Sequence, residues 1–120
     1  MIYIAIALIS LFITASLITA VLYLKSLYYK AIDNTSELIK MGADIIIKDR
    51  NAIIKGVDKL YGAQVYATDL RGGAGLVLAG LVADGYTTVC NIHHIQRGYE
   101  HIEKDLSGLG ANIVRITENK

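Results

Sequence analysis

The chain has 120 residues, of which 53% are hydrophobic, and its twelve Lys and Arg residues nearly balance eleven Asp and Glu residues. This length allows one small domain, and a net charge of +1 gives no overall field for nucleic acid or another highly charged partner. A single cysteine excludes an intramolecular disulfide and a Cys-x-x-Cys metal or redox motif, so a reducing compartment is the default expectation. We expect no metal and no cofactor.

The apolar residues are concentrated in an N-terminal run from Ile2 to Leu24 that contains no formal charge. A helix of this length spans the hydrocarbon layer of a bilayer, which is about 30 Å thick. We therefore predict a transmembrane segment with its juxtamembrane linker over residues 1–33. A cleaved signal peptide is less favoured, because nothing basic precedes the run and the run is long. A helix buried in a protein core is the third reading.

Residues at the ends of the run indicate how it would lie in a membrane. Lys25 and Lys30 follow the run and no basic residue precedes it, so the positive-inside rule places residues 25–120 in the cytoplasm. Aromatic rings that favour the headgroup layers occur at both ends, at Tyr3, Tyr23, Tyr28 and Tyr29.

Residues 34–68 are predicted to form a short helix and three extended pieces. Asn34, Thr35 or Ser36 is expected to cap a helix that ends at Gly42. Two β-branched runs at 43–48 and 52–55 flank a polar turn, which predicts a hairpin, and 65–68 is a further strand.

Residues 72–120 are predicted to continue with alternating helices and strands. Residues 72–83 are apolar nearly all round, which predicts a largely buried helix, and 87–92 predicts a strand. An amphipathic helix is expected from Gly98 to Leu109, followed by a strand at 112–116. The fold class is therefore α/β.

An arginine stands before each of two predicted helix starts, Arg71 before Gly72 and Arg97 before Gly98. A helix N-terminus presents free amides, and a guanidinium matches phosphate or carboxylate with two hydrogen bonds. The pattern is typical of an anion site, although such arginines are more often solvated surface residues, and Asp69 offers Arg71 a simple ion-pair partner.

Other polar residues do not form a recognisable catalytic or metal site. The glycines after Arg71 lack the Gly-Lys-Ser/Thr ending of a phosphate loop. His93 and His94 are adjacent, so on a strand they would point to opposite faces, and with His101 they do not have the spacing typical of metal ligands. Cys90 is interpreted as a small buried hydrophobic residue.

Several separated motifs occur in the second part of the chain. They are Met-Gly-Ala-Asp-Ile (41–45), Ala-Thr-Asp-Leu-Arg (67–71), Leu-Val-Leu-Ala-Gly (76–80), Arg-Gly-Tyr-Glu (97–100) and Leu-Gly-Ala-Asn-Ile (109–113). Together they resemble the C-terminal stretch of the UDP-N-acetylglucosamine 1-carboxyvinyltransferase family, and the similarity is colinear from about Glu37 to Ile116.

The resemblance implies a fold, a reaction and a set of substrate-binding residues. Residues 34–120 would be the C-terminal part of an inside-out α/β barrel of βαβαββ units. The family transfers the enolpyruvyl group of phosphoenolpyruvate to UDP-N-acetylglucosamine in peptidoglycan synthesis and is cytoplasmic. By resemblance, Arg71 and Arg97 would bind phosphoenolpyruvate, and Asp69 and Leu70 would line the same substrate-binding cleft.

The chain also departs from that family. The family's reactive cysteine, catalytic aspartate and substrate-binding lysine lie upstream of the similar region, so we expect no catalytic residue here and no activity of this chain alone. An unrelated apolar leader in front of the enzyme's tail suggests a gene remnant, a truncated copy or a misjoined reading frame. The alternative is a single-span membrane protein with a recruited, non-catalytic cytoplasmic binding module.

Overall fold

The computed structural model describes residues 1–117, except for the side chains of residues 30 and 31. It divides the chain into two compact units, Met1–Ala31 and Ile32–Lys120. The Lys30 side chain, one of the two lysines that support the predicted membrane topology, lies outside the described residues. Residues 118–120, at the end of the predicted domain 34–120, also lie outside them.

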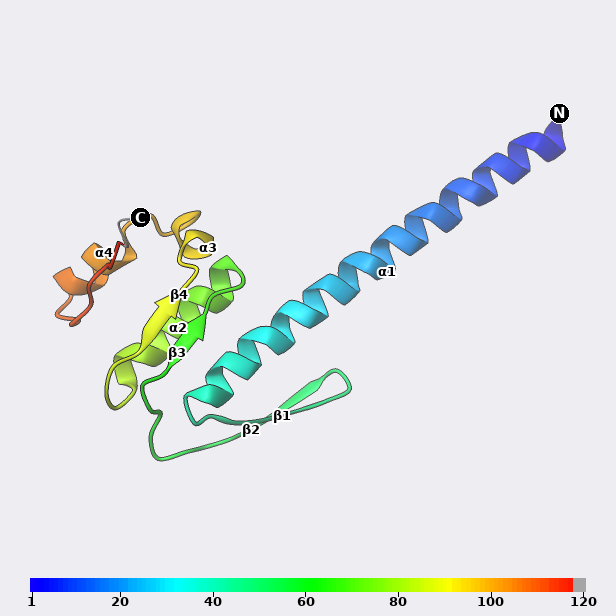
Figure 1. The fold of residues 1–120 in the computed structure, drawn as a ribbon. Coiled ribbons are helices and arrows are strands. Elements are labelled where there is room, and N and C mark those ends of the chain that lie inside the picture. The colour runs from blue at the N-terminus through cyan, green and yellow to red at the C-terminus, as the bar shows by residue number, and fades with distance from the viewer. Residues whose placement is uncertain (118–120) are drawn as a thin grey trace. The chain divides into compact units, whose positions relative to one another are not determined.

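Helix α1 runs without interruption from Ile2 to Lys40 (Figure 1). Neither Gly nor Pro occurs within it, so no residue forces a break, and the predicted separate helix start at residues 34–36 is wrong. Gly42 ends the helix with a φ of 94°, while the amide of Ala43 donates to the carbonyl of Leu38 at 3.2 Å. By length and composition, α1 is able to cross a membrane, and its apolar stretch is not buried by other residues.

The predicted hairpin is confirmed. Strand β1 (Asp44–Lys48) pairs antiparallel with β2 (Asn51–Lys55), and Ile46 lies opposite Ile53. Asp49 adopts a φ of 56°, which suits the tight turn between the strands.

A parallel β–α–β unit follows the hairpin. Strand β3 (Gln64–Tyr66) pairs in parallel with β4 (Thr88–Cys90), and helix α2 (Leu70–Val82) connects them and packs against the pair (Figure 1). A parallel pair needs such a crossover, so the α/β class predicted from the sequence is confirmed.

The free edge of β3 contacts the last turns of α1. The Tyr66 amide donates to Glu37 Oε2 at 2.9 Å, and Lys40 Nζ donates to the other oxygen of this carboxylate at 2.7 Å. Leu38 packs against buried Met41 and Val65. The end of α1 is therefore part of the second unit.

Only one face of α2 is buried. Leu76 packs with Met41 and Val65, and Val77 packs with Ala67 and Ile95. The prediction of a largely buried helix is wrong, because the other face remains in contact with solvent: Leu78 is 56%, Leu81 39% and Val82 74% exposed.

The C-terminal region differs from the predicted helix and strand. Helix α3 (His93–Gln96) follows Asn91, whose φ of 58° ends the extended path of β4, and α4 (Ile102–Gly108) starts only after a turn. His93 and His94 therefore lie on a helix, with ring centroids 4.1 Å apart.

Residues 112–116 do not form the predicted strand, because they have no strand partner among the described residues. The segment is held instead by Arg115, which donates through Nη2 to Glu103 Oε2 at 2.7 Å and to the Glu100 carbonyl at 2.6 Å. Desolvation alone would raise the pKa of Glu103, but a backbone hydrogen bond, Arg115 and His101 together lower the pKa.

Substitution of two glycines of α2 should have opposite effects on stability. A Cβ at Gly73 would lie 2.7 Å from Ile95 Cγ1 and 2.9 Å from Ala67 Cβ, whereas a Cβ at Gly75 would meet nothing within 4 Å. We expect Gly73→Ala to destabilise the second unit by about 1–3 kcal/mol. Gly75→Ala should stabilise it by up to about 1 kcal/mol. Hydrogen exchange of the β3 and β4 amides measures the stability change in each variant. If the two substitutions changed stability equally, the packing described for Gly73 would be contradicted.

The Glu103–Arg115 interaction predicts a component of acid sensitivity. A carboxyl whose pKa is lowered by folding stabilises the fold above its unfolded value, near 4.5, and this contribution disappears as the pH falls through the folded pKa. Glu103→Gln should therefore lower the free energy of unfolding at pH 7 and reduce its decline below about pH 4.5. Asp105→Asn, on the same helix, is the control. An unchanged acid profile in the Glu103 variant would refute the prediction.

Candidate functional site

Asp69 is the N-cap of α2. Its backbone is extended, with φ −151° and ψ 176°, and its side chain accepts a hydrogen bond from the Gly72 amide at 2.8 Å. Because this cap starts the helix at Leu70, Arg71 lies within the first helical turn, not before it as predicted. Arg71 therefore lies near the positive end of the helix dipole.

Arg97 occupies a different position from the predicted one. It follows α3 as its C-cap, with φ −60° and ψ −31°, instead of preceding a helix. The left-handed backbone at Asn91 turns the chain before the predicted helix start at Gly98, and α3 forms at His93–Gln96. Arg97 therefore comes after a helix.

The segments that carry the two arginines nevertheless lie side by side. A Cβ atom at Gly98 would be 2.7 Å from Leu70 Cδ2, so the Leu70 side chain lies directly against the Gly98 backbone. Both segments follow the carboxyl ends of the parallel strands β3 and β4. In open α/β folds this edge is where ligands commonly bind.

Arg71 and Arg97 are both exposed, and neither forms an ion pair with a carboxylate within residues 1–117. The predicted alternative, an Asp69–Arg71 ion pair, is not present. Asp69 Oδ1 instead accepts from the Gly72 amide and from Asn34 Nδ2, the latter at 3.2 Å. The two guanidiniums therefore keep their hydrogen-bond donors available for an anion.

Asn34 and Thr68 support this corner and were not identified as site residues from the sequence. Thr68 Oγ1 donates to Asn34 Oδ1 at 3.1 Å. Asn34 was expected to cap a helix. In the structure the Asn34 side chain bonds to Thr68 and Asp69. The sequence shows only an amide-bearing residue near a predicted helix end, and this does not indicate those two partners.

Within residues 1–117, the cysteine and the histidines do not form a recognisable metal or nucleophilic site. Cys90 is partly exposed instead of buried, and its sulfur lies 3.5 Å from Gln64 Nε2. Among the described residues, no group of three or more His, Cys, Asp or Glu side chains could hold a metal ion.

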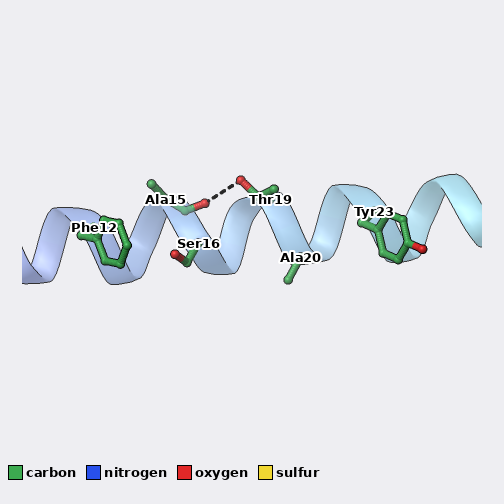
Figure 2. A pocket seen from close by; sticks show the side chains of 6 residues that line it. All are labelled: Phe12, Ala15, Ser16, Thr19, Ala20 and Tyr23. Atoms are coloured by element: carbon green, nitrogen blue, oxygen red, sulfur yellow. Dashed lines mark hydrogen bonds between the residues drawn. The ribbon is translucent and has the colours of Figure 1, made fainter.

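A shallow groove runs along α1 beside Phe12 and Tyr23 (Figure 2). Its other lining residues are small: Ala15, Ser16, Thr19 and Ala20. The Thr19 hydroxyl donates to the Ala15 carbonyl at 2.9 Å, so this polar group is satisfied within the helix (Figure 2). All lining residues belong to one helix and none is charged, so the groove lacks the convergent polar groups of a ligand site.

Comparisons with known proteins agree with the resemblance found in the sequence. Residues 1–106 match the family model of EPSP synthase (3-phosphoshikimate 1-carboxyvinyltransferase). A UDP-N-acetylglucosamine 1-carboxyvinyltransferase of Shewanella frigidimarina is 60% identical over 80 residues, which are 67% of this chain and 19% of that protein. UDP-N-acetylglucosamine 1-carboxyvinyltransferase 3 of Caldanaerobacter subterraneus subsp. tengcongensis is 53% identical over 94 residues, 78% of this chain and 22% of that protein.

A solved structure gives the same result. The enolpyruvyl transferase NikO from Streptomyces tendae superposes with a TM-score of 0.64 and 36% identity, over 72% of this chain and 20% of that one. The predicted family resemblance is therefore confirmed. The chain spans about one fifth of the length of these curated relatives.

Proposed function

Because the chain belongs to the EPSP synthase (3-phosphoshikimate 1-carboxyvinyltransferase) family, we propose that its second unit contributes one side of a phosphoenolpyruvate site. The relatives named above suggest UDP-N-acetylglucosamine as the acceptor of the enolpyruvyl group. Such a reaction would serve peptidoglycan synthesis. The corresponding fold would be part of an inside-out α/β barrel.

The contact between Leu70 and Gly98 carries this proposal, because it brings together the two segments that bear arginines. Phosphoenolpyruvate has a phosphate and a carboxylate, and each of these groups accepts two hydrogen bonds from one guanidinium. We assign Arg71 and Arg97 to these anionic groups, and Asp69 and Leu70 to the wall of the same site. We assign no catalytic step to these 120 residues, so turnover would require groups outside them.

Loss of either arginine should weaken anion binding. Inorganic phosphate and phosphoenolpyruvate would be titrated into the full chain in detergent micelles, with amide shifts of residues 69–72 and 97–98 as the signal. Both side chains are exposed, so we expect Arg71→Ala and Arg97→Ala each to cost about 0.5–1 kcal/mol, and added salt to reduce binding.

Arg50→Ala is the matched control, because it removes the same charge from the exposed hairpin turn. The Arg50→Ala variant should bind inorganic phosphate and phosphoenolpyruvate as tightly as the unchanged chain does. If Arg50→Ala weakens binding as much as the other two substitutions, the interaction is non-specific attraction and the site assignment fails.

We also propose that residues 2–24 anchor the chain in a membrane, with residues 25–120 on the cytoplasmic side. The support is the exposed apolar length of α1 together with Lys25 after the run. This anchor also favours a second candidate function, a membrane-held binding module without catalysis.

Such a module would still bind anions. It differs from a transferase fragment in one measurable respect: enolpyruvyl transfer would not be restored when the rest of a transferase is supplied.

Membrane insertion is tested by charge and by protease protection. Leu17→Arg should move the chain out of the membrane fraction, because an arginine at the centre of a span costs about 2.5–3.5 kcal/mol on the insertion scale. Leu109→Arg is the control, since Leu109 is already 86% exposed in the second unit. A reporter fused after Lys120 should be protected in spheroplasts. Its digestion from outside would rule out the orientation.

A further inference from the structure

The Asn34 side chain connects the end of α1 with the start of α2. Its Nδ2 donates to Asp69 Oδ1 at 3.2 Å, and its Oδ1 accepts from Thr68 Oγ1 at 3.1 Å. The same Asp69 oxygen accepts from the Gly72 amide at 2.8 Å. These partly buried hydrogen bonds form one continuous chain that ends in the first turn of α2.

Gly72 provides the space that Asn34 occupies. A Cβ atom at this position would overlap the Asn34 amide group. The backbone of Gly72 is not in the left-handed region, so its conformation would accept another residue. The requirement for a small residue here therefore comes from Asn34, not from the backbone.

We propose that Asn34 is a positioning residue, which holds the Asp69 carboxylate and the first turn of α2 in the conformation that presents Arg71. A primary amide suits this place because it donates to a carboxylate and accepts from a hydroxyl at the same time. An isolated aspartate cap can rotate, whereas one bonded on the same oxygen by Asn34 and by Gly72 is restrained. This inference rests on the proposed function in one respect, which is that Arg71 binds an anion.

The test measures cap geometry and anion affinity separately in the full chain in detergent micelles. Asn34→Ala should accelerate hydrogen exchange of the Gly72 amide about 2- to 10-fold, the factor that corresponds to one net hydrogen bond. It should weaken binding of inorganic phosphate by a similar factor, although Asn34 itself is not assigned to the anion. Ser36→Ala removes a hydroxyl that donates to the Ile32 carbonyl of the same helix, and it should change neither quantity.

Gly72→Ala provides a second, independent perturbation. It should displace the Asn34 amide and reproduce the effects of Asn34→Ala on exchange in the α2 first turn and on phosphate affinity. In the double variant the two effects should not add, because both remove the same contact. Additive effects would mean that Gly72 and Asn34 act independently, which would overturn the proposal.

The results separate the two hypotheses. Unchanged exchange at Gly72 in Asn34→Ala overturns the positioning role, even if phosphate binds. If the unchanged chain does not bind phosphate, the proposed function fails, and the exchange rates alone decide whether Asn34 fixes the cap. Faster exchange with unchanged phosphate affinity would show that the cap does not control the site, and would also overturn the proposal.

Discussion

The packing of α2 depends on the missing side chain at Gly73. A Cβ there would lie within 3 Å of both Ala67, which follows β3, and Ile95 of α3. Because Gly73 has none, α2 approaches the strands closely enough for Leu76 and Val77 to complete two small apolar clusters. The same close approach brings α3 to the start of α2, where Leu70 lies against Gly98. The geometry of the candidate site is therefore a consequence of how tightly this helix packs.

Local patterns in the sequence predicted the elements whose stability is local. The hairpin follows from two β-branched runs around a polar turn, and the β3–α2–β4 unit from strand and helix patterns separated by short loops. The region after β4 was predicted less well. There, one left-handed residue, Asn91, redirects the chain, and residues 112–116 have β-branched side chains but no strand partner among the described residues. Strand propensity alone does not supply a partner.

The sequence indicated the two arginines of the candidate site but not the side chains that support them. Arg71 and Arg97 were identified because each was predicted to stand between a strand and a helix start. Each does follow a strand, but Arg71 lies inside α2 and Arg97 comes after α3. Asn34 was missed because its partners Thr68 and Asp69 are 34 and 35 residues away. No periodicity or capping rule links positions at such a separation, so only the fold reveals the contact.

The carboxylate of Glu37 has a consequence for association between chains. Successive amides of a strand point to opposite edges, and the Ala67 amide bonds to Cys90 in β4, so the Tyr66 amide faces the outer edge. Glu37 accepts from this amide, and Lys40 holds the carboxylate in place. A strand from another molecule would have to displace a charged group to pair there. The edge of β3 is thereby protected against the intermolecular sheet growth that leads to aggregation.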